Sequence, residues 1–514
     1  MTSENGSAAA ISEDLPQHAD VVIIGTGFSG LGMAIRMKQA GFEDFIVLER
    51  AADVGGTWEA NTYPGCQCDV PSHLYSFSFA LNPGWSRTYS RQPEIWDYLR
   101  RCAREFALIP HIRFNTEATA TAWDEEAEVW RVETSRGPIS ARVLIGGVGP
   151  LSQPSIPTIP GLDSFEGTVF HSAEWNHGHD LAGERVASIG TGASAIQYVP
   201  KIQPKVETLH VFQRTPPWIL PHSDRPTTPV ERRLYRAFPG LQRLVRAGIY
   251  LSRESILPGF IRNQRLLRGA ELLARLHLRR QVRDPELRAK VTPDYTIGCK
   301  RILPTNRWYP AITKPNVELV TEGIREVRAN SIVTDDGVER EVDTIILGTG
   351  FHVTDIPAAH QIRGRGGLLL ADAWQGSPQT YLGTSVAGFP NLFFLIGPNT
   401  GLGHNSMVYM IESQLNYVLD CLRLMGDRGV STVEVRPEVQ DSYNAELQEK
   451  LVDTVWNTGG CMSWYIDRNG RNTTIWPDFT WRFRRRTKCF DADAYRLELD
   501  GASARERSEI AAAT

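Results

Sequence analysis

The 514-residue sequence has few cysteines, no long apolar run and no large excess of either charge. Its seven cysteines are scattered between Cys66 and Cys489, and Cys66 and Cys68 have C-x-C rather than the C-x-x-C spacing of a dithiol redox site. We therefore expect reduced thiols, a cytoplasmic protein and no metal. No run of about 18 apolar residues predicts a membrane span, and the polar N-terminus is unlike a signal peptide. A net charge of −4 does not indicate a nucleic-acid partner.

One nucleotide-binding pattern lies near the N-terminus. Residues 19–24 form an apolar, β-branched run that predicts a buried strand, and it leads into GTGFSG at 25–30. A helix is expected at 31–40, and a second strand at 45–48 ends at Glu49. The order strand, Gly-rich turn, helix, strand is typical of a dinucleotide-binding βαβ unit.

The same order recurs further along the chain. A strand is predicted at 185–189, GTGASA follows at 190–195, a short helix is expected to end before Pro200, and another strand spans 208–212. Antiparallel strand patterns follow each unit. The fold class is therefore predicted as α/β, with two tandem Rossmann-like domains and a helical insert.

The predicted domains are discontinuous in sequence. The first nucleotide-binding domain is assigned to residues 19–155 and 385–500, and the second to 156–225 and 291–384, with the helical insert at 226–290. Residues 1–18 and 501–514, which are rich in small and polar residues, are expected to be disordered tails.

The helical insert carries about fifteen basic residues against five acidic ones between positions 230 and 290. This composition fits a membrane or partner surface, or an amphipathic lid that packs on the enzyme with its basic face in solvent. Pro239, Pro258 and Pro285 divide the insert into short pieces, and we therefore favour the lid.

The first turn has the residues that a pyrophosphate site needs. Gly25 permits the tight turn, Gly27 permits close approach of the backbone to the pyrophosphate, and Gly30 permits close helix packing. Glu49 stands where an acid accepts hydrogen bonds from a ribose diol, and it would repel a 2′-phosphate. We expect FAD or NAD at this turn, while an ordinary tight turn is the alternative.

The second turn ends differently, because Arg214 and Thr215 stand where the first unit has its acid. Arginine presents a planar fork of donors that matches phosphate, which favours NADPH over NADH; a solvated surface arginine is the alternative. Ala195 replaces the third glycine, as the pattern permits. One acid-ended and one arginine-ended site in a single chain indicate hydride transfer from NADPH to a bound flavin.

Two longer motifs make the comparison with known families specific. FEGTVFHSAEW at 165–175 matches F-x-G-x-x-x-H-x-x-x-W, although Asn176 follows where Pro or Asp is usual, and GGTWEANTYPGCQCD at 55–69 matches G-G-x-W-x-x-x-x-Y-P-G-x-x-x-D throughout. The sequence thus resembles the type I Baeyer–Villiger monooxygenases, class B flavoproteins, from about residue 20 to 495. Shorter matches are KR at 300–301, TGF at 349–351, GPNTG at 397–401 and SWY at 463–465.

The resemblance implies an enzyme that uses FAD, NADPH and O2 to convert a ketone into an ester or lactone through a C4a-peroxyflavin. It implies that Arg301 and Asp69 are catalytic, with Arg301 stabilising the peroxide and Asp69 orienting it. Lys300 resembles a residue that holds the NADPH 2′-phosphate, and Trp464 one that reaches the NADP ribose. For each, an ordinary structural role is the alternative.

His171 is expected to couple the domains at a linker rather than to move protons. The other matching residues of the 165–175 motif are Phe165, Gly167 and Trp175. The other residues expected to bind a cofactor are Phe28, Ser29, Gly56, Thr57, Trp58, Tyr75, Gly190, Thr191, Gly192, Ser194, Gly350 and Asn399.

Three other functions compete with ketone oxygenation. An N- or S-oxygenating flavin monooxygenase would have Tyr where Trp175 stands, and Arg301 with Asp69 also argues against it. An electron-transferring flavoprotein, such as a reductase or NADPH oxidase, is a second alternative, but a disulfide reductase would need C-x-x-C near the flavin. A non-catalytic protein would be expected to have eroded glycine turns, and both turns are intact.

Overall fold

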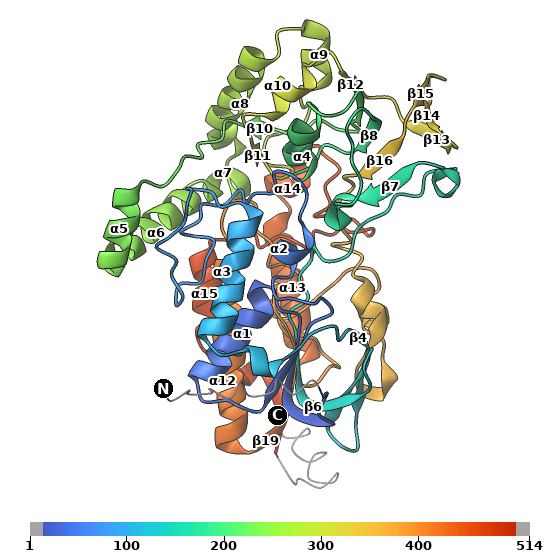
Figure 1. Ribbon diagram of the computed structural model, residues 1–514. Coiled ribbons are helices and arrows are strands. Elements are labelled where there is room, and N and C mark those ends of the chain that lie inside the picture. The colour runs from blue at the N-terminus through green and yellow to red at the C-terminus, as the bar shows by residue number, and fades with distance from the viewer. Residues whose placement is uncertain (1–13, 500–514) are drawn as a thin grey trace, which may run out of the picture.

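The computed structural model describes residues 14–499. Figure 1 shows two α/β lobes, one above the other, with a run of helices along their outer edge. The predicted tails lie outside the described residues, except for 14–18, of which His18 already belongs to the first strand. None of the helices in the described part of the chain is long and apolar enough to cross a membrane.

The first sheet is centred on β1 (His18–Ile24), which pairs in parallel with β2 (Phe45–Leu48) and with β6 (Ile139–Gly146). β3 (Ile112–Arg113) extends the sheet beyond β2, and β18 (Leu392–Phe394) pairs in parallel with β6. The apolar run of β1 is buried on both faces, as the near-continuous β-branched pattern predicts.

A late segment of the chain returns to this sheet. β4 (Ala118–Asp124) and β5 (Val129–Thr134) continue it antiparallel beyond β6, and β17 (Ile362–Arg363) pairs in parallel with β4. Leu370 and Trp374 of α11 (Leu370–Trp374) are buried in the same core. The predicted boundary at residue 385 is therefore wrong for this segment, which belongs with the first sheet.

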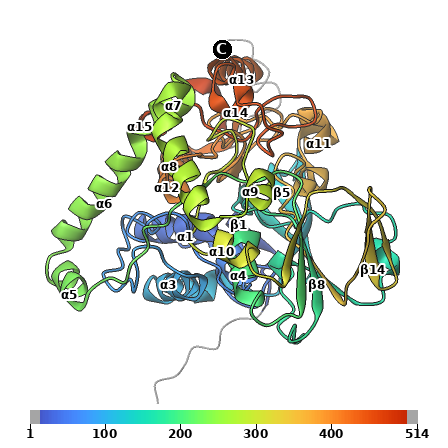
Figure 2. The ribbon, with the colours of Figure 1, turned by 90° about the horizontal axis from the view of Figure 1, so that it is seen from above.

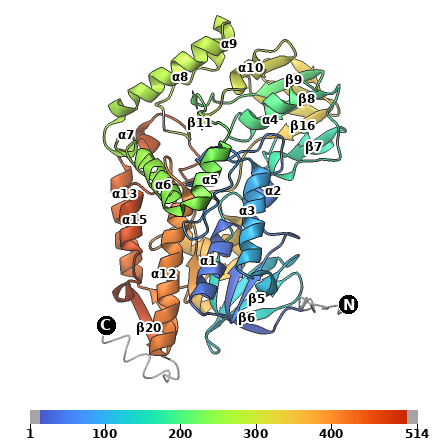
Figure 3. The same ribbon diagram turned by 60° about the vertical axis from the view of Figure 1, so that its left-hand side comes forward.

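Three helices stand against this first lobe. α1 (Phe28–Gln39) contacts both α12 (Met407–Arg428) and α3 (Gln92–Glu105), and the three lie side by side in Figure 3. Gly32 of α1 allows the close approach, because a Cβ there would lie 2.8 Å from the Leu415 side chain of α12. α12 continues the first domain after the second lobe.

The second sheet is parallel throughout. Its strand order is β12–β9–β8–β16–β7, and the predicted strands at 185–189 and 208–212 are confirmed as β8 (Arg185–Ile189) and β9 (Thr208–Phe212). The other members are β7 (Thr168–His171), β12 (Val317–Val320) and β16 (Thr344–Leu347). The prediction of two Rossmann-like domains in an α/β chain is confirmed.

The helix after the second turn is longer than predicted. α4 spans Ala195–Ile202 with Pro200 inside it, whereas Pro200 was expected to end the helix. Proline removes one backbone hydrogen bond. However, Ile196, Val199 and Ile202 are buried, and their packing outweighs that loss.

The insert is helical and divided, as predicted. α6 (Pro239–Glu254) and α9 (Pro285–Lys290) each begin at a proline, and α7 (Leu257–Ile261) has Pro258 as its second residue. Proline suits the first helical turn because its missing N–H would be unpaired there. The remaining helices of the insert are α5 (Pro229–Ala237) and α8 (Arg268–Gln281).

The other described helices and strands are short or peripheral. They are α2 (Thr57–Ala60), β10 (Ile219–Leu220), β11 (Leu303–Pro304), α10 (Trp308–Ile312), β13 (Ile324–Arg328), β14 (Ser331–Thr334), β15 (Glu339–Glu341), β19 (Val430–Val435), α13 (Pro437–Leu451), α14 (Val455–Thr458), α15 (Thr480–Arg486) and β20 (Tyr495–Leu499).

Candidate active site

The first Gly-rich turn is tightly packed against its own chain. Gly25 has a φ of +94°, which glycine adopts without strain, and a Cβ on Gly30 would lie only 1.8 Å from the Gly25 carbonyl oxygen. The Glu49 carboxylate accepts hydrogen bonds from the Thr26 amide (2.9 Å), the Thr26 hydroxyl (2.5 Å) and the Ala51 amide (2.8 Å). Glu49 is thus held at the end of β2, with one lone-pair position left for a ribose hydroxyl.

A second glycine faces this turn. A Cβ on Gly56 would lie 3.0 Å from the Cα of Gly27, and a Cβ on Gly27 would meet nothing nearer than 3.8 Å. Bare backbone from two motifs therefore meets at close range, and the lack of side chains there suits the approach of a pyrophosphate. Phe28 and Ser29 are buried in the first turn of α1.

Aromatic side chains cluster beside the first turn. The Trp58 indole N–H donates to the Tyr75 hydroxyl at 3.1 Å, and the Tyr75 and Phe28 ring centroids are 5.1 Å apart. Trp58 follows Thr57 at the start of α2. The structure thus brings together Phe28, Thr57, Trp58 and Tyr75, which are separated by up to 47 positions in sequence.

The second turn is more open. Gly190 has a φ of +108°, and a Cβ there would lie 2.4 Å from the Gly348 carbonyl oxygen, whereas a Cβ on Gly192 would meet no described atom within 4 Å. The Thr191 hydroxyl donates to the Thr215 carbonyl at 3.3 Å. Ser194 and Ala195 lie at the start of α4.

Two cations lie near this turn, as the sequence predicts for a 2′-phosphate. The pKa of Lys300 is lowered by burial and then by the charge of Arg214, which shows that two residues 86 positions apart share one region of positive potential. Arg214 is exposed. A doubly charged phosphate would relieve the repulsion between these two cations.

Asp69 and Arg301 form a two-point ion pair. The Nε and Nη2 groups of Arg301 each donate to a carboxylate oxygen of Asp69 at 2.6 Å. Burial disfavours the charged form of Asp69, but the charge and hydrogen bonds of Arg301 lower its pKa overall. The charge of Asp69 in turn raises the pKa of Arg301. Both groups therefore stay ionised at neutral pH.

This pairing leaves part of the guanidinium free. Arginine has five N–H donors, and Asp69 takes two of them; within residues 14–499 Nη1 has no hydrogen-bond acceptor. The Arg301 side chain is 33% exposed. The geometry therefore presents a fixed positive charge with free donors.

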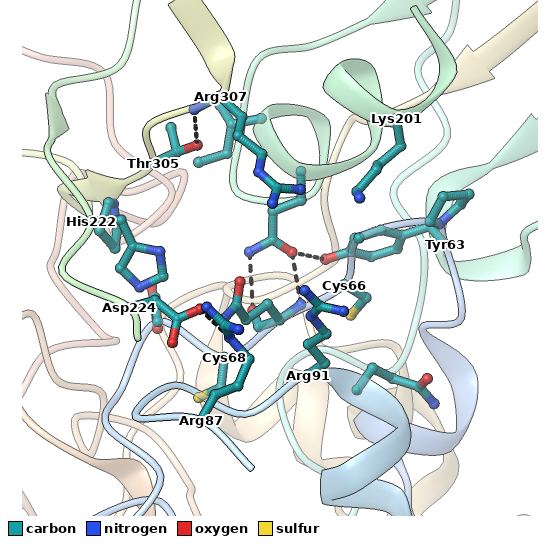
Figure 4. Close-up of a pocket in the computed structure, with 18 of the residues that line it drawn as sticks. Tyr63, Cys66, Cys68, Arg87, Arg91, Lys201, His222, Asp224, Thr305 and Arg307 are labelled. Atoms are coloured by element: carbon teal, nitrogen blue, oxygen red, sulfur yellow. Dashed lines mark hydrogen bonds and ion pairs between the residues drawn. The ribbon is translucent and has the colours of Figure 1, made fainter. Parts of the chain in front are cut away.

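A cavity of about 420 Å³ lies at the seam between the two lobes (Figure 4). Asp69 lines it, and Figure 4 shows Arg91, Lys201 and Arg307 directed into it from three separate segments. Gln197 of α4 bridges the seam, because it accepts from the Gln67 amide at 3.0 Å and donates to the Gln67 carbonyl at 3.0 Å. Residues 62–69 of the 55–69 motif line part of this cavity, but no local sequence motif pointed to Gln197.

Residues of the 165–175 motif pack within the second lobe. The ring of Trp175 lies between Phe170 of β7 and Tyr198 of α4. A Cβ on Gly167 would lie 2.2 Å from the Asp343 carbonyl oxygen and would also collide with the Phe165 ring. These three residues are placed as structural elements of the second lobe.

His171 is the last residue of β7, and its role in coupling the domains stays a prediction. Its Nδ1 accepts a hydrogen bond from the Ala173 amide at 3.1 Å, and its ring contacts Phe351. Burial lowers its pKa, while the Gly350 backbone acts in the opposite direction. The Gly350 carbonyl also accepts from the Ser155 amide. The two linker segments therefore run side by side next to His171.

Asn399 and Trp464, which are both expected to bind a cofactor, differ in how far they are buried. The amide of Asn399 is buried and donates to the carbonyls of Asn472 (2.9 Å) and Ile475 (3.0 Å), so its side-chain donors hold the C-terminal loop. Trp464 is 47% exposed, while its neighbour Tyr465 is buried. Burial raises the pKa of Tyr465 to about 12 against the opposing effect of nearby Arg301, which places Tyr465, not singled out from the sequence, beside the ion pair.

The expectation of reduced thiols is wrong at one place. Cys299 and Cys461, 162 positions apart, form a disulfide that joins the segment before Arg301 to the loop carrying Trp464. Burial raises the pKa of both Cys66 and Cys68, that of Cys66 to about 12, so neither provides a thiolate at neutral pH. Cys66 and Cys68 therefore do not supply the redox-active cysteine pair that a dithiol reductase needs.

Taken together, the fold and the site define a class of enzyme. Two glycine turns of bare backbone, one ending in a carboxylate and one beside two cations, fit FAD and NADPH respectively, and the Asp69–Arg301 pair lies at the seam between the lobes. This arrangement is that of a two-dinucleotide flavoprotein oxidoreductase.

Comparison with known proteins is specific within that class. Residues 22–234 match the pyridine nucleotide-disulphide oxidoreductase family. A Baeyer–Villiger monooxygenase of Pseudomonas aeruginosa is 53% identical over 500 residues, covering 96% of this chain and 95% of that protein. Another from Streptomyces coelicolor is 52% identical, with 94% of each chain covered.

Solved structures agree with the sequence relatives. Cyclohexanone monooxygenase from Rhodococcus sp. Phi1, bound to NADP+, superposes with a TM-score of 0.85 at 30% identity, over 94% of this chain and 100% of that one. The protein OTEMO, in complex with FAD and NADP, superposes with a TM-score of 0.84 at 29% identity, over 93% and 99%. This chain belongs to the Baeyer–Villiger monooxygenases, and it is an FAD- and NADPH-dependent oxidoreductase; N- or S-oxygenation is not favoured.

Proposed function

We propose that the Asp69–Arg301 pair is the catalytic centre at which this Baeyer–Villiger monooxygenase converts a ketone into an ester or lactone with NADPH and O2. The observation that carries the proposal is the two-point pair at 2.6 Å, which leaves the remaining guanidinium donors unoccupied. An anion in a site shielded from water needs such a fixed positive charge.

The two cofactors are assigned to the two turns. The first turn, with Gly27, Gly56 and Glu49, would hold FAD, and the second, with Gly192, Arg214 and Lys300, would hold NADPH. When bound, the flavin accepts hydride from NADPH and activates O2. The protein contributes position and charge at the seam between the two turns.

Arg301 is the group that touches the reacting atoms in this proposal. Its unpaired N–H groups stabilise the negative charge that develops on oxygen as the carbonyl carbon is attacked. Asp69 holds the guanidinium plane and balances its charge between turnovers. Burial raises the pKa of the Tyr465 hydroxyl to about 12, and the charges of Arg301 and Asp69 both act on this group.

The test separates cofactor reduction from oxygen transfer. Arg301→Ala should still show flavin bleaching when NADPH is added without O2, but ester formation from a ketone panel should fall by about 10³-fold or more. Arg307→Ala, an exposed arginine of the cavity, is the matched control and should keep ester formation. Mass analysis for the gain of one oxygen gives the readout. An Arg301→Ala enzyme that still forms ester at near wild-type rate would refute the assignment.

A further inference from the structure

Helix α6 of the insert packs Ile249 and Tyr250 against the core, but it departs from an ordinary surface helix in its other residues. Its side toward the body buries Gln242, Arg246 and Glu254, whereas Leu244 and Leu251 are 71% and 64% exposed. A surface helix normally shows the opposite pattern. The core of the protein therefore does not explain the leucines of α6.

The buried polar groups are fully engaged, so the orientation of α6 is specified. Gln242 donates to the Asn82 carbonyl at 2.8 Å, and Arg246 donates to the carbonyls of His73 and Ser76. Glu254 accepts from Thr480 at 2.7 Å. Rotating the helix to bury its leucines would leave these groups without partners, at about 1–3 kcal/mol each.

The outer side of α6 is a continuous apolar stripe. Leu241, Leu244 and Leu251 recur at helical spacing with Gly248 between them, and a Cβ on Gly248 would meet no described atom within 4 Å. Figure 2 shows α6 running along the outer edge of the molecule, with α5 at its end. Nothing within the described residues covers this stripe.

The stripe is one part of the apolar surface that the insert exposes. Half of the exposed large apolar side chains in the described chain belong to the insert, although the insert makes up about an eighth of the sequence. We call this surface the insert face. It comprises Val230, Leu234, Phe238, Leu241, Leu244, Leu251, Ile256, Leu266, Leu272, Leu273 and Leu276.

Strong positive charge accompanies the apolar residues. Residues 230–290 carry fifteen basic and five acidic side chains, while the whole chain has a net charge of −4. Exposed arginines accompany the leucines: Arg243, Arg262, Arg265, Arg268, Arg279 and Arg280. The partner of the insert face is therefore both apolar at contact and negatively charged.

We propose that the insert face docks on the surface of a lipid bilayer that contains anionic lipids. Helices that lie in the membrane interface combine exposed leucines with arginines in this way, and each basic residue near an anionic surface adds about 1 kcal/mol of attraction. The apolar residues extend over several helices and include one aromatic residue, Phe238, whereas protein–protein contacts concentrate aromatic anchors in a compact centre.

The charge also distinguishes a bilayer from a second copy of the chain. A two-fold contact would set the insert face against itself, so that two strongly positive segments would repel. An anionic bilayer has the complementary charge and adapts to any surface shape. The docking is peripheral, through the apolar stripe, and concerns a site apart from the Asp69–Arg301 pair.

Flotation of the holoenzyme with lipid vesicles tests the proposal. The protein should float with vesicles of phosphatidylcholine and phosphatidylglycerol, float weakly with phosphatidylcholine alone, and lose binding as salt is raised. The double variant Leu244→Glu/Leu251→Glu should partition at least about tenfold less, because burying each leucine is worth about 1.5–3 kcal/mol.

Matched variants separate this surface from general apolarity. Leu368→Glu/Val338→Glu changes two exposed apolar residues outside the insert, which are 41% and 45% exposed, and should bind vesicles as the wild type does. Both double variants should retain turnover of a small water-soluble ketone, which shows that they are folded.

Three results would overturn the proposal. One is a wild-type enzyme that does not float with anionic vesicles, and another is undiminished flotation of Leu244→Glu/Leu251→Glu. The third is concentration-dependent self-association in sedimentation, without vesicle binding, that the same double variant abolishes; the insert face would then belong to a second copy.

Discussion

The two Gly-rich turns share a sequence pattern but differ in how much of the chain surrounds them. At the first, Gly30 touches Gly25, Gly56 faces Gly27 and all but one lone-pair position of Glu49 is taken. At the second, the space beside Gly192 is open and Arg214 is exposed. This difference in packing predicts that the first turn retains its ligand and that the second exchanges it. Retention and exchange thus arise from packing around the same motif.

The largest expected effect is at Gly30. In Gly30→Ala the new methyl group would lie 1.8 Å from the Gly25 carbonyl oxygen, and backbone cannot yield there without opening the turn. We expect protein purified without flavin, as measured by its visible absorbance. Ala195→Gly, the same third position in the second turn, is the control and should stay yellow. A fully flavinated Gly30→Ala would show that the first turn is looser than its packing indicates.

The second effect concerns coenzyme choice. Arg214→Gln should raise the KM for NADPH by about 10–100-fold, because a charge-assisted contact to phosphate contributes about 1.5–3 kcal/mol. The KM for NADH should barely change. Steady-state kinetics with both coenzymes measures this, and equal losses for both would mean that Arg214 does not read the 2′-phosphate.

A smaller effect tests the open space itself. Gly192→Ala adds a methyl group where no described atom lies within 4 Å, so thermal stability should stay unchanged while the KM for NADPH rises by several-fold, since the backbone no longer approaches the pyrophosphate closely. Gly190→Ala should instead lower the thermal stability, because Gly190 has a φ of +108° and its new Cβ would lie 2.4 Å from the Gly348 carbonyl oxygen. If Gly192→Ala left the KM unchanged, the cradle would not hold the pyrophosphate.

The smallest effect is on pH dependence. The pKa of Asp69 is lower in the folded protein than the value of about 4 expected for the unfolded chain. The pair with Arg301 therefore contributes its full stabilisation at any pH above the unfolded pKa. This stabilisation is lost only as the pH falls through the lower pKa of the folded state. Ester formation should therefore show no loss due to Asp69 between about pH 8 and pH 5. Asp69→Asn should lower the rate at every pH without moving the profile. A wild-type titration near neutrality that this variant removes would contradict the sign of the shift.

Local patterns in the sequence predict much of this molecule. The core strands at 19–24, 45–48, 185–189 and 208–212, both glycine turns and the partnership of Asp69 with Arg301 were anticipated, the last through a family motif. What was missed depends on contacts between distant positions: the return of β17 to β4, the Cys299–Cys461 disulfide and Tyr465 beside Arg301. At Pro200, local propensity pointed to a helix end, and burial of Ile196 and Ile202 overrode it.

The return of the chain to the first sheet also orders its biosynthesis. The second sheet is complete at β16 (Thr344–Leu347), whereas the first sheet still lacks β17 and β18, which ends at Phe394. Domains generally fold as units during synthesis. The second lobe can therefore fold on the ribosome before the last strands of the first lobe have been synthesised. In a nascent chain stalled near residue 380, the second sheet would accordingly be complete, whereas the first sheet would still lack β18.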